Sequence, residues 1–333
     1  MKLGRCVACS LARVDLSGLD LQGADLRGSD LSGADLSATR LDGALLYQAN
    51  LAGALLRDAR LDRASLSRAD LSGVDLQGQS LLQGRLSYAR LHSARLNGAN
   101  LRQANLQGAD LTDADLTGAD LSQARLTQVD FSGVRLERTR LSGARLRGAD
   151  LTVARSLTGS DFSAADLRHG RLSGIDMRGI DLSDARMLGA DLRGTNLQGA
   201  RLVTAELKKS DLREADLSGA DLSGARLIGA RLAQARFRGA RMVNVELGGN
   251  LIDTDFSDTL IQRSSLAGAN LKGARFEGAT LNGVDFSGAN LYGVDFTRAE
   301  LSRCLFEKAN LNQTLFTESQ RRKNRIDVRP VPD

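Results

Sequence analysis

Residues 109–126 read ADLTDADLTGADLSQARL, with a leucine at every fifth position. In an α-helix, residues five apart point about 140° away from one another, so these leucines would not share a face. In a flat β-strand, an odd spacing would send alternate leucines to opposite sides of the sheet. Neither regular element explains the spacing, so the chain is expected to bend by the same amount once in every five residues.

This five-residue unit, or pentad, is repeated along nearly the whole chain. From Leu11 to Phe316 the centre of each pentad is a large apolar residue, and the register shifts by one residue at two places. Self-similarity over such a length indicates a repeat architecture. We predict one solenoid over residues 1–316, followed by a basic tail or cap over residues 317–333. The two breaks in register fall near residues 152–157 and 245–251.

The composition of the pentad predicts which side chains face inward. The residue two places before each centre is usually small, as at Ala109 and Ala114, and a polar residue separates it from the centre. We therefore expect the small residue and the centre to be buried and the other three positions to face water. Glycine is frequent two places after the centre, as at Gly23 and Gly28, where a turn benefits from its freedom to adopt a positive φ.

Two sets of residues recur at four times the pentad length and so predict the size of one coil. They are spaced by 20 residues, except for one spacing of 19 that spans the missing residue: Phe237, Phe256, Phe276, Phe296 and Phe316, and Asn250, Asn270, Asn290 and Asn310. Four pentads per coil would place each set in one column, with stacked rings and an asparagine ladder. At the ~4.8 Å spacing of hydrogen-bonded strands, the array would form about 15 coils and a rod roughly 75 Å long.

The pattern A(D/N)LXX, seen as ADLTD at residues 109–113 and ANLQG at residues 104–108, resembles the pentapeptide-repeat family. The resemblance covers about residues 4–316. It implies an all-β fold, the right-handed quadrilateral β-helix, and a bacterial protein that has no cofactor and is not an enzyme. Some members of this family protect DNA gyrase from quinolones and are thought to resemble duplex DNA, whereas others are secreted effectors.

The charge of the chain does not suit a DNA mimic. The chain has 45 Lys plus Arg and 40 Asp plus Glu, for a formal net charge of +5, whereas a DNA mimic should be clearly acidic. The nearest approach to an acidic column, Asp110, Asp130 and Asp150, is flanked by Arg90 and Arg171. Protection of DNA gyrase is therefore the second hypothesis, and it is based on the family alone.

Positive charge is not expected to gather on one face either. An arginine-rich stretch at residues 226–241 falls one coil above the acidic residues of 206–221, so ion pairs between neighbouring coils are expected. Nucleic acid is therefore not an expected partner. The C-terminal tail is the better candidate for contact with a polyanion, through Arg321, Arg322, Lys323 and Arg325.

Residues that carry catalysis or bind metals are sparse. Cys6, Cys9 and Cys304 all fall on predicted inward positions, so we interpret them as packing residues. A zinc site would need further ligands near Cys6, and a disulfide between Cys6 and Cys9 is the alternative. The two histidines, His92 and His169, lie in different parts of the array, so no Ser/His/Asp constellation is expected. We predict no catalytic, metal or cofactor site.

Function is expected where the repeat is irregular. The most irregular stretch is residues 74–91, where the bulky Gln79 occupies a small inward position. Large apolar side chains at outward positions in and near this stretch form a predicted contact site for a partner protein: Leu45, Tyr47, Leu55, Leu82 and Tyr88. Scattered apolar residues are also common on protein surfaces, so ordinary surface variation is the alternative.

These features favour a non-enzymatic, rod-like scaffold that binds another protein. The beginning of the chain, MKLGRCVACS, lacks the apolar core of a signal peptide, and no stretch is apolar enough to span a membrane. We therefore predict a cytoplasmic protein, unless a secretion route without a cleaved signal is used. Protection of DNA gyrase, and a role as a secreted effector or polyanion-binding protein, are the alternatives. The sequence identifies neither the partner nor the oligomeric state.

Overall fold

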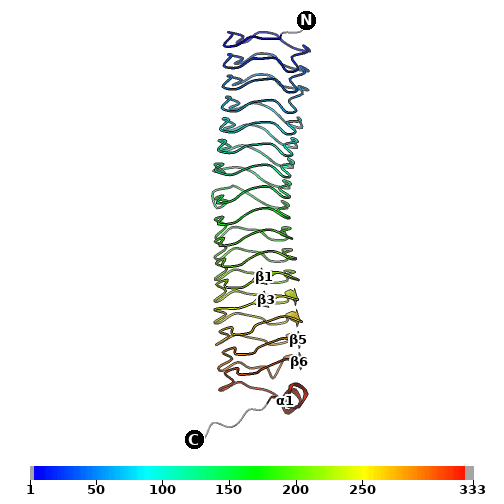
Figure 1. Cartoon of the computed structure of the whole chain (residues 1–333), viewed down its shortest axis with the longest axis vertical. Coiled ribbons are helices and arrows are strands. Elements are labelled where there is room, and N and C mark those ends of the chain that lie inside the picture. The colour runs from blue at the N-terminus through cyan, green and yellow to red at the C-terminus, as the bar shows by residue number, and fades with distance from the viewer. Residues whose placement is uncertain (1–3, 327–333) are drawn as a thin grey trace. The chain divides into compact units, whose positions relative to one another are not determined.

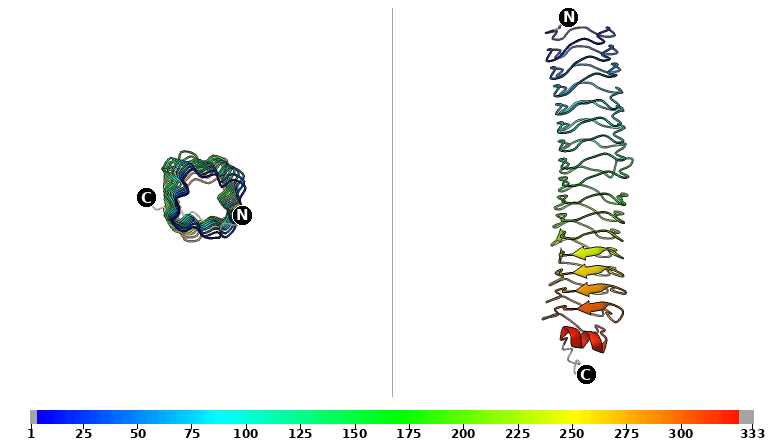
Figure 2. Two further views of the ribbon diagram at one scale, coloured as in Figure 1. Left: turned by 90° about the horizontal axis from the view of Figure 1, so that it is seen from above. Right: turned by 90° about the vertical axis from the view of Figure 1, so that its right-hand side faces the viewer.

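The computed structural model describes residues 4–326. The chain divides into two compact units, Met1–Asp166 (unit 1) and Leu167–Asp333 (unit 2). Within each unit the backbone winds into stacked coils with four sides (Figure 1 and Figure 2). Parallel bridges join residues 20 positions apart, such as Leu45 and Ser65 in unit 1 and Asp191 and Asp211 in unit 2, so one coil contains four pentads.

Regular strands are short because the chain turns once per pentad. In unit 2, β1 (Arg226–Leu227) pairs with β3 (Glu246–Leu247). A second parallel sheet has the order β2-β4-β5-β6, and its strands are β2 (Arg241–Val243), β4 (Leu260–Gln262), β5 (Thr280–Asn282) and β6 (Glu300–Ser302). Single bridges hold the other coils together. The helix α1 (Glu318–Asn324) follows the last pentad.

The core of each unit consists of the pentad centres and the small residues two places before them, as predicted. Leu111 and Ala114 in unit 1 and Leu197 in unit 2 are fully buried. Burial of each leucine contributes about 1.5–3 kcal/mol to stability. Where a hydroxyl replaces the small apolar side chain, it can donate to a backbone carbonyl of the preceding coil, as Thr139 does to Leu116 (2.8 Å).

The phenylalanine and asparagine columns of unit 2 form as predicted. The ring centroids of Phe237, Phe256 and Phe276 lie 5.2 and 5.1 Å apart, with nearly parallel planes. The side-chain amide of Asn290 donates to Asn270 at 3.0 Å. Residues one coil apart therefore stack directly, which stiffens this part of unit 2.

The turn after each centre explains two preferences of the repeat. The residue two places after the centre has a positive φ, which glycine adopts without strain, as at Gly118 (φ +69°). The side chain of the aspartate before the centre accepts a hydrogen bond from the backbone N–H of the residue after the centre. Asp110 accepts in this way from Thr112 (3.0 Å). The many aspartates of the sequence thus belong to the turns of the scaffold.

Two changes in bridge spacing accompany the breaks in register. In unit 1, Arg135 pairs with Ser156, 21 positions later. In unit 2, Arg236 pairs with Asp255, 19 positions later. One extra and one missing residue are thus each absorbed within a single coil.

The helix α1 covers the last coil of unit 2. It begins at a capping box formed by Thr317 and Gln320. The buried Gln320 side chain donates to the carbonyl oxygens of Phe296 (2.7 Å) and Ala299 (2.8 Å), which would otherwise lie at an open edge. The rest of the predicted tail, residues 327–333, lies outside the described residues.

Candidate functional site

In unit 1, most neighbouring coils are joined by a regular series of backbone hydrogen bonds. Asp115 illustrates the pattern, because its N–H donates to the carbonyl of Ala94 (3.0 Å) and its carbonyl accepts from the N–H of Leu96 (2.8 Å). These two bonds form one parallel bridge. Asp75 lies two coils earlier in the same column, so the repeat predicts the same two bonds there.

Two bridges of this level are missing within residues 4–326, the one between Leu55 and Asp75 and the one between Arg60 and Ser80. Among the described residues, neither the Asp75 N–H nor the Leu56 N–H has a hydrogen-bond acceptor. The Ala54 carbonyl, which is the expected acceptor for Asp75, is likewise unpaired within this part of the chain. The bridges from Leu55 to the preceding coil and from Asp75 to the following coil are present, so the gap is confined to one level of the stack.

The gap coincides with Gln79, which occupies a position that alanine fills in neighbouring coils, at Ala59, Ala99 and Ala119. The Gln79 amide lies against the preceding coil, where its nitrogen donates to the Ala59 carbonyl (2.9 Å) and its oxygen accepts the Asp58 N–H (3.1 Å). This orientation of the amide is assigned from its hydrogen-bond partners. A glutamine is too long for a site that fits alanine, and its amide takes the place of two backbone bonds between these coils.

A cavity of about 550 Å³ lies between the two coils beside Gln79, and we call it the Gln79 seam. It is lined by Gly53, Ala54, Leu55, Leu56, Arg57 and Asp58 of one coil and by Gly73, Asp75, Gln77 and Gln79 of the next. Leu55, on the rim, is 56% exposed. Arg57 pairs with Asp58 on its own coil (3.7 Å), and no ion pair among the described residues joins the two rims. The seam therefore offers unpaired backbone donors and acceptors beside an apolar side chain.

A second hollow, of about 460 Å³, lies in unit 2. Within the described part of this unit, Arg275 and Asp295 lack the bridge that their column would predict. Here Glu277 accepts a hydrogen bond from Arg298 of the next coil (2.5 Å). An ion pair thus already spans this hollow, in contrast to the Gln79 seam.

The predicted contact residues are only partly brought together. Leu45, Tyr47 and Tyr88 lie on one side of unit 1, whereas Leu55 lies on the opposite side and Leu82 on the side between them. These residues therefore do not share one side of the coil, because ten residues are half of a four-pentad coil and lead to its opposite side. Their contact with a partner stays a prediction. Leu82 is also half-buried, and its N–H donates to the carboxylate of Asp62 in the preceding coil (3.0 Å).

Tyr88 contacts its own unit as well as solvent. The guanidinium of Arg68 lies 5.8 Å from the ring centre, in a cation–π arrangement. The ring covers Gly108 of the next coil so closely that a Cβ at residue 108 would come within 2.5 Å of it. Tyr88 is therefore part of the wall of unit 1, although 51% of the residue is exposed.

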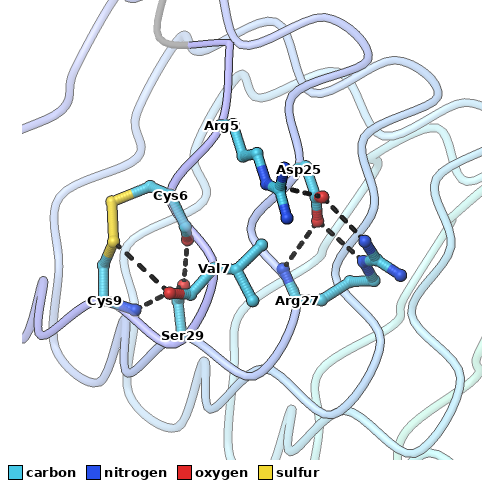
Figure 3. Close-up of a disulfide and its surroundings, with 7 residues drawn as sticks. All are labelled: Arg5, Cys6, Val7, Cys9, Asp25, Arg27 and Ser29. Atoms are coloured by element: carbon cyan, nitrogen blue, oxygen red, sulfur yellow. Dashed lines mark hydrogen bonds and ion pairs between the residues drawn. A yellow bond between two sulfur atoms is a disulfide. The ribbon is translucent and has the colours of Figure 1, made fainter.

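The N-terminal cysteines form a disulfide (Figure 3). The interpretation of Cys6 and Cys9 as free packing residues was therefore wrong, because one turn places their Cα atoms 5.5 Å apart, within the range that a disulfide needs. The Ser29 hydroxyl of the next coil donates to the Cys6 carbonyl (2.6 Å) and accepts the Cys9 N–H (3.1 Å). Disulfides are typical of oxidising compartments, which weighs against the predicted cytoplasmic location.

Cys304 is the packing residue that the sequence predicts. It is free and only 2% exposed. Burial raises the pKa of its thiol, so little reactive thiolate forms near neutral pH. Its N–H donates to the Asn324 side chain of α1 (2.9 Å), which ties the residue to the C-terminal cap.

Centres for metals or catalysis do not assemble in residues 4–326. No group of three His, Cys, Asp or Glu in this range is placed to hold a metal ion. His92 and His169 are exposed and belong to different units. Within the same range, no helix is both long and apolar enough to cross a membrane.

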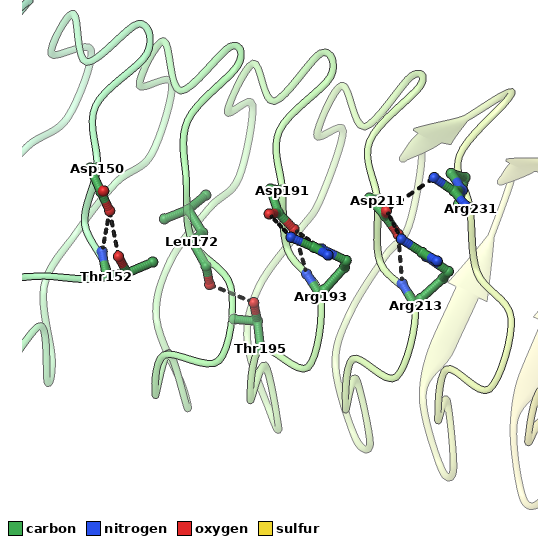
Figure 4. Close-up of polar contacts among 9 residues, drawn as sticks. All are labelled: Asp150, Thr152, Leu172, Asp191, Arg193, Thr195, Asp211, Arg213 and Arg231. Carbon is green, nitrogen blue, oxygen red and sulfur yellow. Dashed lines mark hydrogen bonds and ion pairs between the residues drawn. The ribbon is translucent and has the colours of Figure 1, made fainter.

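Charged side chains of unit 2 form pairs within and between coils (Figure 4). The Arg193 guanidinium donates to both carboxylate oxygens of Asp191, at 2.7 and 2.6 Å, and thereby lowers the pKa of that carboxyl. Asp211 bonds in the same way to Arg213 and also pairs with Arg231 of the next coil (3.5 Å). Part of the arginine-rich stretch is thus neutralised, as the sequence predicts.

The predicted polyanion site lies on and after α1. Arg321, Arg322, Lys323 and Arg325 are all exposed. Arg322 pairs with Glu318 one turn earlier (2.9 Å), so part of its charge is compensated. Their contact with a polyanion stays a prediction.

Sequence reasoning singled out Gln79 but missed the backbone groups that it exposes. The unpaired groups belong to Ala54, Leu56 and Asp75, which are ordinary members of the repeat. The signal that could have found them is the length of a glutamine in a column of alanines. The bonds that Gln79 affects are those to the preceding coil, because its side chain bonds to Asp58 and Ala59 of that coil.

The four-sided coils of parallel-bridged pentads define the class of this protein. The chain belongs to the pentapeptide repeat family. The sequence profile of this family, described as Pentapeptide repeats, matches the chain eight times, at residues 9–46, 39–78, 85–123, 114–152, 160–199, 205–244, 250–288 and 261–298. No curated protein sequence matches the chain.

Several solved structures are similar to parts of the chain. HetL, a pentapeptide repeat protein involved in heterocyst differentiation regulation in the cyanobacterium Nostoc sp. strain PCC 7120, is 29% identical, with 72% of this chain and 89% of that chain covered and a TM-score of 0.32. QnrB1, a plasmid-mediated fluoroquinolone resistance protein, is 18% identical, with 74% of this chain and 91% of that chain covered and a TM-score of 0.29. A pentapeptide repeat protein from the Arabidopsis thaliana thylakoid lumen is 27% identical over 45% and 72%, with a TM-score of 0.10.

Proposed function

We propose that the protein is a non-enzymatic scaffold that binds another protein through the outer wall of unit 1, at the Gln79 seam. The observation that supports this proposal is the local opening of a regularly hydrogen-bonded wall beside the exposed Leu55. In a solenoid each coil contacts only its neighbours, so the outward positions are free to serve binding without changing the fold. Leu55 supplies an apolar contact next to the hollow, where a partner could bury it.

The test is an affinity capture of the full-length, tagged protein from its native lysate, with two matched variants. Leu55→Ser removes the apolar side chain at the seam. Leu305→Ser is the control, because Leu305 occupies the same position of its pentad in unit 2 and is 55% exposed. We expect the wild type and Leu305→Ser to recover the same specific partner and Leu55→Ser to lose it. Equal recovery by all three proteins would contradict the proposal.

Protection of a topoisomerase is a less well supported alternative. A DNA mimic needs a continuous acidic face, but the column of Asp110 and Asp130 continues into Arg90, which pairs with Asp70 (3.3 Å). The net charge of +5 has the wrong sign as well. A supercoiling assay with DNA gyrase, with and without a quinolone, would support this alternative only if the purified protein altered the activity.

Contact with a polyanion through the basic residues of the C-terminal cap is a third candidate. Four exposed basic residues lie within residues 321–325. Such binding should weaken steeply with salt, because it releases counterions. Heparin binding that is unchanged between low and high salt, or that survives removal of the four charges, would exclude it. Bacterial origin and the right-handed sense of the coil are parts of the proposal that rest on the family.

A further inference from the structure

We propose that one side of unit 1 is a basic face that binds the phosphate backbone of duplex nucleic acid, without regard to its sequence. The face consists of one unbroken column of bridged residues, which runs from Arg5 to Arg145, and of the turn that follows this column in each coil. It lies on the opposite side of the coils from Leu55. The inference therefore goes beyond the proposed function and does not depend on the Gln79 seam.

Arginine dominates the basic face. Each coil contributes its bridged residue and the two residues that follow the adjoining pentad centre. Over residues 5–148 these positions hold one acidic residue, Asp25, and the following exposed arginines: Arg5, Arg27, Arg68, Arg85, Arg125, Arg145 and Arg147. The expectation that positive charge gathers on no face was wrong, because it was drawn from residues 226–241 and not from the sides of unit 1.

Most of this charge is not compensated within the protein. In residues 4–326, the ion pairs of the basic face join only Asp25 to Arg5 (3.8 Å) and to Arg27 (2.8 Å). Arg125 and Arg145 bridge directly to each other. Like charges that lie opposite each other on neighbouring strands are destabilising. An anion bound from outside would relieve this repulsion.

A second pair of stacked arginines shows how the fold compensates such a contact elsewhere. Arg40 and Arg60 also bridge to each other, on another side of unit 1. Arg40 pairs with Asp20 (3.7 Å) and Arg60 with Asp42 (3.2 Å). The basic face lacks such carboxylates beside its stacked pair, so its charge is available to a partner.

The spacing and chemistry of the face suit a regular chain of phosphates. Because neighbouring coils are ~4.8 Å apart, the seven steps from Arg5 to Arg145 cover roughly 34 Å, close to one turn of duplex DNA (about 34–36 Å). A guanidinium binds a phosphate through two parallel hydrogen bonds. The described part of unit 1 has no helix to enter a groove, so the contact is with the backbone and not with base edges.

The other side chains of the face favour nucleic acid over an anionic membrane. Its exposed apolar and aromatic residues lie only in residues 7–88. Between residues 105 and 128 the face is polar and carries no large apolar side chain, although Arg125 and Arg145 lie in and next to this part. Binding at a membrane surface needs apolar side chains that enter the lipid beside the basic ones. The stacked arginines have no such anchors.

The experiment measures binding of a fluorescein-labelled 20-base-pair DNA duplex to the full-length protein by fluorescence anisotropy. The test variant carries Arg125→Gln and Arg145→Gln. The matched control carries Arg40→Gln and Arg60→Gln, which remove the same charge from the compensated pair. We expect the test variant to bind at least about tenfold more weakly and the control to bind within about twofold of the wild type. No binding by the wild type, or equal loss in both variants, would overturn the inference.

The dependence on salt tests the phosphate contacts themselves. Each contact that is lost lowers the slope of log K against log salt by about 0.9, so the test variant should have a slope smaller by about 2. The melting temperature of this variant should not fall, since two opposed like charges are removed. An unchanged slope would overturn the inference.

Two further probes separate the basic face from other sources of binding. If Arg321→Gln with Arg322→Gln abolishes duplex binding and the test variant keeps it, the C-terminal cap is the site and the inference falls. Vesicles of phosphatidylglycerol and phosphatidylcholine are tested by co-sedimentation. Binding to these vesicles that depends on Arg125 and Arg145, without binding to the duplex, would overturn the inference in favour of a membrane surface.

Discussion

Two regions of unit 1 share the same repeat but differ in how their coils are joined. At Ala99 and Ala119 an alanine fills the inward position, and the backbone hydrogen bonds from Leu96 to Asp115 and from Leu101 to Asp120 are regular. At the Gln79 seam a longer polar side chain occupies the equivalent position, and the bonds around Asp75 are missing. The pentad centre Leu76 is fully buried all the same. The wall of such a solenoid can therefore open at one level while its core stays intact, and this separates a surface for binding from the part that maintains the fold.

The largest expected effect comes from a charge in the core. Leu111→Lys places a charge at a fully buried pentad centre, and it should cost roughly 4–5 kcal/mol or more, because nothing there can solvate or pair the amine. Leu56→Lys should cost less, since Leu56 lines the cavity of the seam and the amine can reach water. Chemical denaturation followed by circular dichroism measures both. Equal costs would show that the seam is closed to solvent.

A smaller effect is expected when a glutamine is introduced into the regular region. Ala119→Gln repeats the Gln79 feature two coils later and should open the wall between Leu96 and Asp115. Forcing a larger side chain into a packed site typically costs about 1–3 kcal/mol. The exchange rates of the Leu96 and Asp115 amides should rise along with the loss of stability. Unchanged exchange would mean that glutamine alone does not open a coil, and that the seam has another cause.

The contrast between these regions also shows what could be predicted from sequence. The phenylalanine spacing predicted four pentads per coil, and stacked rings such as those of Phe256 and Phe276 confirm it, because a fixed pentad converts spacing into position. The missing backbone bonds at Asp75 could not be predicted from spacing, because they depend on how the neighbouring backbone rearranges around the longer Gln79 side chain. The disulfide of Cys6 and Cys9 depends on the distance that one turn sets between them. The sides of the predicted contact residues were not read from the sequence either, because their coils were compared without their sides, and Leu55 lies on the side opposite Tyr88.

The smallest expected effect concerns the charged pairs of unit 2. The pKa of Asp191 lies below its usual 3.8, first because Arg193 donates to it. Its stabilisation is therefore present above the unfolded pKa and is lost as the pH falls through the lower folded pKa. The melting temperature of the wild type should fall as the pH drops from about 5 to below 3.8, and that of Arg193→Gln should fall less. At pH 6, Arg193→Gln should melt about 1–3 °C lower, as suits an exposed pair. An equal fall in melting temperature with pH for the wild type and Arg193→Gln would contradict this account.

The central claim, that Gln79 opens one level of the wall, is tested most directly by amide hydrogen exchange in the free, full-length protein. The Leu56 and Asp75 amides are compared with those of Leu96 and Asp115, which have the same roles in the regular region. We predict exchange at least about tenfold faster at Leu56 and Asp75, and equal protection at all four amides in Gln79→Ala. Equal protection in the wild type would contradict the claim, because the missing bonds would then be present in solution.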